Sequence, residues 1–425
     1  MPRLTGGVHK SGLRLSTNSR PSKAVRLVRG VGAAVWDAEG RRYVDLSSQT
    51  MNLLFGQCHP VINQAIERQL ATLTFADQDF EHDAYPEAMS RLAAFLPPHL
   101  TTFNFRLCDG SSAVECAVKM ARRARDRGRI LTFEGIYLGQ NTQSLHLRGW
   151  GERRKELLVG SQEDVVFAPL PRPDFDQPFD ASPAENGATA CEMIDRLHES
   201  LACVIIDPVM ISAGVTKGRG LHRLVHRVIA CAHRHDVPVI LDECQTFGWV
   251  PDGTLARHYG FDADLLVLGK GIGGGMPLAV CVSRPRYDGL KWGDADYTNG
   301  GTLAAMAGML ATCELLESPA TRAHVAEMAN EVSLLEARLS LSLGDQVATR
   351  GIGLIRAIQL REFPSEEDAC AAAVAVSRRC LTRGVIVRSH TDCLTLKPPL
   401  SAELTDLREA FAILEHEIRH EMRMK

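Results

Sequence analysis

Two short apolar runs, each ending in a charged residue, constrain the fold of this chain more than any other feature. Residues 237–241 are apolar and rich in β-branched side chains, and Asp242 follows them; residues 264–268 are similar, and Lys270 follows within a glycine-rich segment. Continuous apolar runs are typical of buried parallel strands, and ligand sites of open α/β sheets lie at the carboxyl ends of such strands. The pattern therefore predicts that Asp242 and Lys270 face one crevice.

A carboxylate and a lysine placed in this way match the requirements of pyridoxal phosphate chemistry. The lysine holds that cofactor as a Schiff base, and the carboxylate keeps the pyridine nitrogen protonated so that the ring takes up electrons. Two other interpretations stay open on this stretch alone. Residues 269–274 also satisfy the G-x-G-x-x-G pattern of a dinucleotide-binding loop, although Pro277 interrupts the helix which that pattern requires. The other interpretation is that Lys270 and Asp242 are solvated polar residues at strand ends, with no ligand.

A second stretch predicts an anion site. The sequence DGSSAVE at 109–115 follows a predicted strand and begins a predicted helix, with Ser112 and Glu115 as a capping box. Gly110, Ser111 and Ser112 offer backbone N–H groups, hydroxyls and the positive end of the helix dipole to a phosphate. A plain capped helix with no ligand is the alternative for this segment.

Charge and cysteine content bear on the classes of function. The chain has 48 Lys and Arg against 51 Asp and Glu, a net charge of −3, so nothing favours binding to nucleic acid or to an anionic membrane. No apolar run has the length of a membrane span or of a signal-peptide core, which predicts a cytoplasmic protein. The twelve cysteines include no C-x-x-C pair, and many lie in apolar runs, so we expect buried free thiols rather than disulfides or a metal site.

The remaining segments predict an α/β architecture in two domains. A large domain at 57–318 has a mostly parallel central sheet flanked by helices, and a smaller α+β domain combines 1–56 with 319–425. Residues 1–24 are expected to form a loosely held arm, and 171–190 a surface loop. Further elements are expected as strands at 33–36, 42–46, 351–360 and 384–388, and as helices from Pro60 to about 73, at 220–236, over 302–344 and from about 402.

Taken together, these segments resemble the class III (subgroup II) aminotransferases, pyridoxal phosphate enzymes of fold type I, from about Gly32 to Leu400. DGSSAVE at 109–115 is similar to the family's phosphate-binding S-G-(S/T)-E-A-N-E, and FEGIYLG at 133–139 to its F-x-G-x-Y-H-G. VIIDPV at 204–209 is similar to I-E-P-V, DECQTFG at 242–248 to D-E-V-Q-T-G-F-G, and LGKGIGGGMPL at 268–278 to the lysine segment. Late motifs match at 351–360 and 396–400.

The resemblance implies a role for each residue around the cofactor ring. Lys270 is the Schiff-base lysine and also the base that moves the proton between the substrate carbon and the cofactor. Asp242 pairs with the pyridine nitrogen, and Gln245 hydrogen-bonds the ring oxygen. Tyr137 stacks on the ring. The implied cofactor is therefore pyridoxal 5'-phosphate.

The resemblance also implies a phosphate site and a homodimer. Gly110, Ser111 and Ser112 match the residues that hold the phosphate. The family uses a threonine of the second subunit for the same phosphate, and Thr298 matches that residue. The active sites are therefore expected to be shared across a dimer interface.

The implied reaction is the transfer of an amino group between a primary amine and a small amino or keto acid. Members that act on α-amino acids have an arginine where this chain has Thr395, whereas Arg388 matches the mobile arginine of the ω-amine transaminases. One guanidinium binds a carboxylate through two parallel hydrogen bonds, so Arg388 is expected to bind the acidic partner. The amine is then one without an α-carboxylate, such as an amino sugar or another specialised metabolite.

Other reactions remain as alternatives at this stage. An epimerase, an aminomutase or a decarboxylase of the same fold uses the same electron sink, because the protein chooses which bond breaks. A nicotinamide-dependent oxidoreductase is a further alternative, from the dinucleotide pattern at 269–274.

Overall fold

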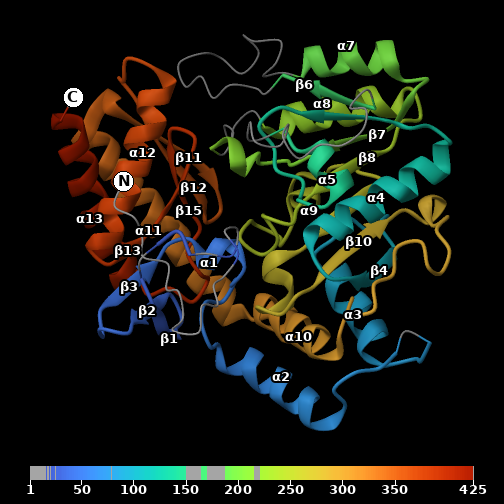
Figure 1. Cartoon of the computed structure of the whole chain (residues 1–425), viewed down its shortest axis with the longest axis horizontal. Coiled ribbons are helices and arrows are strands. Elements are labelled where there is room, and N and C mark those ends of the chain that lie inside the picture. Colours follow the sequence, from blue (N-terminus) through green and yellow to red (C-terminus); the bar gives the residue numbers. More distant parts are fainter. Residues whose placement is uncertain are drawn as a thin grey trace.

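The computed structural model describes residues 16, 19, 21–23, 25–77, 79–149, 164–169, 187–214 and 221–424. Three sheets and the helices that cover them make up the fold (Figure 1). Most of the predicted N-terminal arm, and all but the end of the predicted surface loop at 171–190, lie outside the described residues.

The central sheet has seven strands in the order β4-β10-β9-β8-β7-β5-β6. The neighbours β9, β8, β7, β5 and β6 are parallel, whereas β10 is antiparallel to both β9 and β4. The expected mostly parallel sheet is confirmed, and the two apolar runs that define it are β8 and β9. The strands are β4 (Thr102–Leu107), β5 (Arg129–Phe133), β6 (Val165–Ala168), β7 (Leu201–Ile206), β8 (Val239–Asp242), β9 (Leu265–Leu268) and β10 (Ala279–Ser283).

Helices cover this sheet, because every residue of β7, β8 and β9 is buried and each face needs an apolar layer. α4 packs on β7, β9 and β10 with its face of small and β-branched side chains. The apolar face predicted for the helix at 220–236 is buried from Leu224 to Ala232. The helices in this part of the chain are α4 (Gly110–Arg125), α5 (Thr142–Leu147), α7 (Ala188–Leu197), α8 (Leu221–His233) and α9 (Leu255–Tyr259).

There are two four-stranded sheets besides the central one, and the first of them joins the N-terminal strands to the C-terminal part of the chain, which lie side by side in Figure 1. In the first sheet, the C-terminal strand β13 pairs in parallel with β3, and the order is β1-β2-β3-β13. The second has the order β11-β12-β15-β14. The strands are β1 (Leu27–Val31), β2 (Ala34–Asp37), β3 (Arg42–Asp45), β11 (Val347–Ile352), β12 (Ile355–Leu360), β13 (Val385–Ile386), β14 (Arg388–His390) and β15 (Cys393–Leu396). The domain boundaries near 57 and 318 stay predictions.

Two predicted elements are divided in the structure. The single strand expected at 351–360 is a hairpin of β11 and β12, which turns at Gly353 with a φ of 56°. A Cβ at Gly353 would lie 2.4 Å from the carbonyl oxygen of Trp249, so this turn has room only for glycine. The helix expected over 302–344 is two helices, because Ser318 is extended and Pro319 begins the second.

The remaining helices pack around these sheets. α10 contacts both α2 and α3; α11 and α12 pack on the C-terminal sheet, and α13 packs on α11 and α12. Within the described ranges, no helix combines the length and the apolar character that crossing a membrane requires. The bounds are α1 (Ser48–Met51), α2 (Pro60–Thr72), α3 (Ala84–Ala93), α10 (Leu303–Glu317), α11 (Pro319–Leu343), α12 (Glu366–Thr382) and α13 (Leu404–Arg423).

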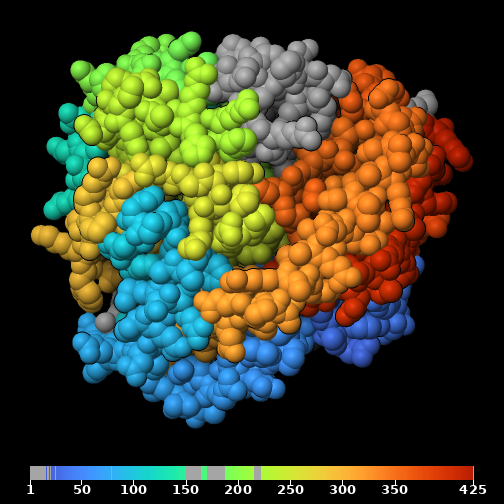
Figure 2. Space-filling view, turned by 180° about the vertical axis from the view of Figure 1, so that it is seen from behind, coloured from blue at the N-terminus to red at the C-terminus, as the bar shows by residue number. Residues whose placement is uncertain are grey.

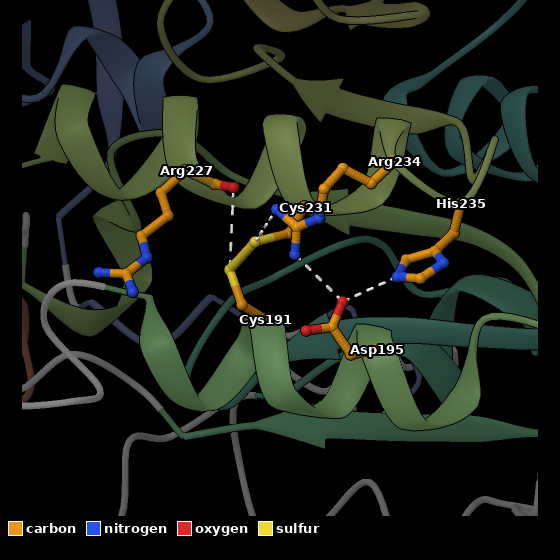
Figure 3. The surroundings of a disulfide bond; sticks show 6 residues. All are labelled: Cys191, Asp195, Arg227, Cys231, Arg234 and His235. Atoms are coloured by element: carbon orange, nitrogen blue, oxygen red, sulfur yellow. Dashed lines mark hydrogen bonds and ion pairs between the residues drawn. A yellow bond between two sulfur atoms is a disulfide. The ribbon is translucent and has the colours of Figure 1, made fainter.

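A disulfide joins α7 to α8 (Figure 3). Cys191 and Cys231 are 40 residues apart in sequence, but their Cα atoms lie 5.7 Å apart because the two helices pack side by side. The prediction that all twelve cysteines are free thiols is therefore wrong for this pair; the other ten are free. Asp195 of α7 adds a second link, since it accepts hydrogen bonds from Arg234 and His235 (Figure 3).

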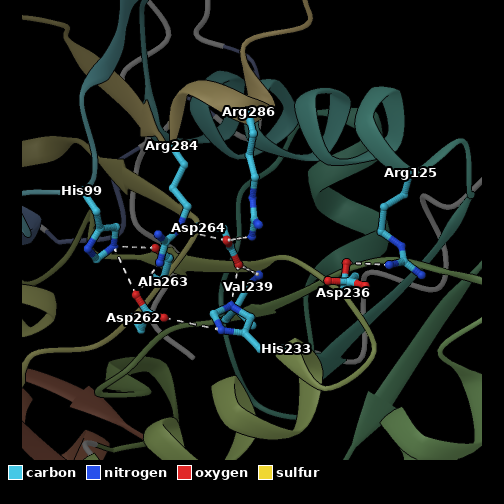
Figure 4. Close-up of polar contacts among 10 residues, drawn as sticks. All are labelled: His99, Arg125, His233, Asp236, Val239, Asp262, Ala263, Asp264, Arg284 and Arg286. Carbon is cyan, nitrogen blue, oxygen red and sulfur yellow. Dashed lines mark hydrogen bonds and ion pairs between the residues drawn. The ribbon is translucent and has the colours of Figure 1, made fainter.

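A buried carboxylate ties together the amino ends of β8 and β9 (Figure 4). Asp264 accepts hydrogen bonds from the His233 ring at 2.8 Å, from the Val239 N–H at 3.0 Å and from Arg286 at 2.6 Å, and it pairs with Arg284 at 3.1 Å. Burial by itself raises the pKa of Asp264, but its hydrogen-bond donors outweigh burial and hold that pKa below its ordinary value. The ionised carboxylate thus stabilises the fold.

We expect Asp264→Ala to lower the free energy of unfolding by about 1.5–3 kcal/mol, because it removes a buried carboxylate together with its charge-assisted hydrogen bonds. A carboxyl group whose pKa is depressed by folding contributes stability above its unfolded pKa of about 3.9 and loses that contribution as the pH falls through the lower folded value. The difference between wild type and variant in urea unfolding should therefore be full at pH 7 and should shrink below about pH 4.

Asp262 is the matched control, because it lies beside the same groups but its side chain is 61% exposed. Asp262→Ala should change the free energy of unfolding by less than about 1 kcal/mol. Equal losses for the two variants would contradict the central place given to Asp264.

Candidate active site

A cavity of about 340 Å³ opens at the carboxyl ends of β8 and β9. Its volume suits a small ligand, and its position follows the rule for open α/β sheets. Six of the nine site residues predicted from the sequence line it: Gly110, Ser111, Tyr137, Asp242, Gln245 and Lys270. The structure therefore brings together residues that are up to 160 positions apart in the chain, the span from 110 to 270.

Asp242 presents a buried carboxylate to this cavity. Its Oδ1 accepts a hydrogen bond from the Cys244 N–H at 2.9 Å, and the Cys244 thiol is a second donor to the same carboxylate. Burial raises the pKa of Asp242 above its ordinary value, although the Cys244 N–H and the Lys270 ammonium oppose this rise. A protonated ring nitrogen is the kind of charged donor that would keep this carboxylate ionised.

The neighbouring Glu243 points the other way and has a structural role. Its carboxylate accepts hydrogen bonds from the Thr246 hydroxyl at 2.6 Å and from the N–H groups of Leu255 and Ala256 at 2.8 and 2.7 Å, at the first turn of α9. Burial raises the pKa of Glu243 to about 7. Of the two acidic residues at the end of β8, only Asp242 is available to a ligand.

Lys270 begins the turn after β9 and shares the cavity with Tyr137. Its backbone is left-handed, with a φ of 49°, an uncommon conformation that non-glycine residues adopt mostly at turns and functional sites. The Lys270 Nζ lies 5.9 Å from the centroid of the Tyr137 ring. That ring is held by a 2.8 Å hydrogen bond from Gln140 to its hydroxyl and by Arg148, which lies 4.9 Å from its centroid.

The glycine-rich segment after β9 does not form a dinucleotide site. Residues Lys270–Gly273 form one short 3₁₀ turn, and the chain then enters the antiparallel strand β10. A dinucleotide fingerprint requires an α-helix directly after the glycines. The nicotinamide-dependent oxidoreductase, which was inferred from this pattern, is therefore wrong. Pro277 prevents the helix that a dinucleotide site requires.

The amino end of α4 lies at the opposite side of the cavity, and its cap differs from the prediction. Asp109 is the N-cap: its carboxylate accepts from the Ser112 N–H at 2.8 Å, and the Asp109 N–H donates to the Ser112 hydroxyl at 3.2 Å. The predicted capping box of Ser112 with Glu115 is wrong, because the N-cap is Asp109, three residues earlier, and the helix begins at Gly110. Glu115 instead accepts from the Ser144 N–H at 3.0 Å.

This cap divides the two serines. The hydroxyl of Ser112 is buried and donates to the Asp109 carbonyl at 2.7 Å, so it does not line the cavity. The Ser111 hydroxyl lies on the cavity wall and accepts from the Gln140 N–H at 3.1 Å. The role predicted for Ser112 in phosphate binding stays a prediction.

The cavity fits a phosphorylated pyridine. A Cβ at Gly110 would lie 3.0 Å from the Cys244 sulfur, and one at Gly139 would lie 2.7 Å from the Ser111 hydroxyl oxygen, so both backbones reach the cavity where side chains have no room. The helix end of α4 offers N–H groups to an anion at one side, and Asp242 offers a carboxylate at the other. Phosphate and ring nitrogen are the two poles of such a cofactor.

Three predicted residues lie elsewhere, and two relevant residues were missed. Thr298 is exposed, and Arg388 lies half-buried on β14; like Ser112, neither lines the cavity. The cavity residue Asn52 was missed because it follows α1, whose four residues all have positive φ, a conformation that no sequence pattern predicts. The fully buried Lys397 was also missed, since lysine is almost never found so deeply buried.

Comparison with known proteins agrees with this geometry. The family model described as Aminotransferase class-III matches residues 16–418. The chain is 29% identical to a 2-aminoadipate transaminase of Pseudomonas putida over 412 residues, 92% of this chain and 95% of that protein. It is 28% identical to an acetylornithine aminotransferase of Methanopyrus kandleri over 403 residues, 93% and 94% of the two chains.

Solved structures share the fold. The chain matches an aminotransferase from Vibrio fluvialis in a PMP-bound form with a TM-score of 0.84 at 19% identity, covering 94% of this chain and 93% of that one. An omega-aminotransferase from Paracoccus denitrificans matches with the same TM-score and identity and covers 94% of each chain. The chain thus has the fold type I architecture expected from its sequence. Since the family match spans nearly the whole chain and the cavity fits the cofactor, this protein belongs to the class III aminotransferases and uses pyridoxal 5'-phosphate.

Proposed function

We propose that this enzyme transfers an amino group between a primary amine and a small amino or keto acid. The observation that carries the proposal is the single cavity in which the Asp242 carboxylate, the Lys270 amine and the amino end of α4 meet. These groups match the ring nitrogen, the aldehyde carbon and the phosphate of the cofactor in turn. The family membership supports the same class of reaction.

Each residue has a separate task in this proposal. When bound, the cofactor supplies an electron-poor ring that stabilises negative charge on the substrate carbon. Lys270 would hold the cofactor through its amine and would carry a proton to and from the substrate carbon. Asp242 would hold the proton of the ring nitrogen, Gln245 would donate to the ring oxygen, and Tyr137 would pack against the ring.

Lys270→Ala should abolish the visible absorption band of the lysine-bound cofactor and lower the rate of amino transfer by about 10²–10⁴-fold, because the variant has neither the covalent link nor the proton carrier. The band is measured on the purified protein after dialysis against pyridoxal 5'-phosphate. If the band persists in the variant, Lys270 is not the residue that binds the cofactor covalently.

Asp242→Asn is the control that keeps the lysine and removes only the charge. It should retain the visible band and yet turn over about 10²–10³-fold more slowly, because an amide does not stabilise a protonated ring nitrogen. Near-normal turnover would contradict the role of Asp242.

We also propose a homodimer with shared active sites. Thr298 is exposed beside Gly300, and the backbone N–H of Tyr297 donates to the Arg106 carbonyl at 2.9 Å, so the loop is fixed on β4 with Thr298 directed outward. An exposed threonine fixed in this way is available to a second copy of the chain. The large side chain of Trp292, which is 76% exposed and lies six residues before Thr298, supports an interface in this region.

Ser111→Ala and Thr298→Ala should each weaken cofactor retention by about threefold to tenfold while leaving the wavelength of the band unchanged, since a phosphate hydrogen bond anchors the cofactor and takes no part in the chemistry. Dialysis followed by absorbance measures retention, and sedimentation should find a dimer. A monomer at micromolar concentration, or full retention in Thr298→Ala, would count against the shared site.

For the acidic substrate we propose Arg388. The register places Arg388 opposite Thr395, and in the same row across the sheet Ala357 pairs with both Thr395 and Arg350. Directly paired residues share one face of a sheet. Arg350 reaches from this face to the Gly214 carbonyl at 2.8 Å, which supports a face turned towards the segment after β7.

The environment of Arg388 favours an anion. Burial lowers the pKa of its guanidinium and Asp45 opposes that shift, while a guanidinium stays charged at any working pH. Thr395 has a 3.0 Å hydrogen bond with the His390 ring, so it is already engaged. Two relatives are named for 2-aminoadipate and acetylornithine, which are amino acids. A first screen of amino donors should therefore include amino acids as well as amines and amino sugars.

Arg388→Ala should lower kcat/KM about 10–100-fold for the half-reaction with the acidic partner and leave that with a carboxylate-free amine nearly unchanged, because a charge-assisted pair is lost in only one of the two. Stopped-flow absorbance measures each half-reaction. Arg383→Ala is the control: Arg383 is an exposed arginine that pairs with Glu417, and its removal should affect neither half-reaction. Equal loss in both half-reactions of Arg388→Ala would remove the case for a switch.

Epimerisation by the same fold is the competing proposal, and one observation separates the two. Amino transfer converts the bound cofactor to its amine form when a donor alone is added. Exchange of the substrate α-hydrogen for solvent deuterium with no ketone product would favour an epimerase instead.

A further inference from the structure

Lys397 is a fully buried lysine that follows β15 and lies outside the cavity. Its backbone is fixed by the N-terminal segment: its N–H donates to the Leu46 carbonyl at 2.6 Å, and its carbonyl accepts from the Ser48 hydroxyl at 2.6 Å. The side chain therefore leaves a rigid junction between the two ends of the chain. Its direction is set by that junction.

The Lys397 side chain ends against the loop that follows Asp242. Its Nζ donates a hydrogen bond to the backbone carbonyl of Gln245 and lies 3.7 Å from the centroid of the Trp249 ring. The indole N–H of Trp249 in turn donates to the Pro398 carbonyl at 2.9 Å. The loop from 245 to 249 is thus held at both of its ends by the consecutive residues 397 and 398.

The Lys397 amine interacts electrostatically with residues of the cofactor cavity. Burial holds the pKa of Lys397 well below its ordinary value, Lys270 lowers it further, and Asp207 and Cys244 raise it. Lys270 and Cys244 both line the cavity. In the described part of the chain no carboxylate forms an ion pair with Lys397, so the Gln245 carbonyl and the Trp249 ring are its polar and aromatic partners.

Such an arrangement is costly unless it has a function beyond packing. Burial of an amine without a carboxylate opposes folding, and an apolar side chain of similar size would fill the same space without that cost. The carbonyl that the amine holds belongs to Gln245, whose side chain lines the cavity. Fixing the backbone of a residue is the most direct way to fix the direction of its side chain.

We propose that Lys397 is a positioning residue of the cofactor site, which holds the Gln245 carbonyl and thereby keeps the Gln245 amide directed at the cofactor ring oxygen. The inference rests on the proposed function, because that function assigns the ring oxygen to Gln245. A donor at this oxygen weakens its hold on the proton that it shares with the Lys270 nitrogen. Loss of the donor therefore raises the pH at which the visible band changes.

The test is a pH titration of the visible band in the dimeric holoenzyme. Lys397→Met keeps the volume and the contact with Trp249 but removes the hydrogen-bond donor. Its band midpoint should rise by about one pH unit, a tenfold change in proton affinity, and cofactor should dissociate about threefold to tenfold more readily. A variant that melts at a lower temperature but has the wild-type midpoint and affinity would make Lys397 merely structural and overturn the proposal.

A double-mutant cycle shows whether Lys397 acts through Gln245. Gln245→Ala should raise the midpoint by a similar amount, and adding Lys397→Met to it should change the midpoint no further. Additive shifts would overturn the proposed route. Should Lys397→Met not fold, Lys397→Leu replaces it in the same cycle, since leucine also has no donor. Absence of the band in the wild-type protein would instead refute the proposed function, so the two failures are distinguishable.

Discussion

The facing of Asp242 and Lys270 across neighbouring parallel strands is the constraint on which the rest of the site depends. β8 and β9 are buried throughout, so the first polar residues after them meet at one edge of the sheet. Burial opposes the charge on Asp242, and that charge is held by the Cys244 N–H and by Lys270. A cationic group of a ligand between these strands would further stabilise the charge on Asp242.

The opposite edge of the same sheet carries stability and not chemistry. Asp264 stands at the amino end of β9, where His233, Arg284 and Arg286 converge on it (Figure 4). Protein groups alone supply the hydrogen bonds of the Asp264 carboxylate, because this end of the strand does not bind a ligand in the proposed function. Lys270 follows the carboxyl end of the same strand. It has a left-handed backbone conformation and lines the open cavity. The two ends of one strand therefore have separate tasks.

The small sheets close the site through contacts that join both ends of the chain to the loop after β8. Lys397 and Pro398 hold the ends of the segment from Gln245 to Trp249, and Leu46 and Ser48 hold Lys397. Gly353 packs against the Trp249 carbonyl from the β11–β12 turn. Trp249 and Gln245 are therefore the residues at which the small sheets contact the loop beside the cofactor site.

The sequence by itself determined the sheet, the family and six residues of the cavity, because apolar strand runs and the charged residues after them are local patterns. It did not determine the cap of α4, since Asp109 and Ser112 compete for that position on similar chemistry and only the entry of the chain into the helix decides between them. The Cys191–Cys231 bond and the burial of Lys397 were decided by tertiary structure alone. Both depend on which segments, distant in sequence, pack together in the fold. The spacing of residues along the chain does not determine that packing.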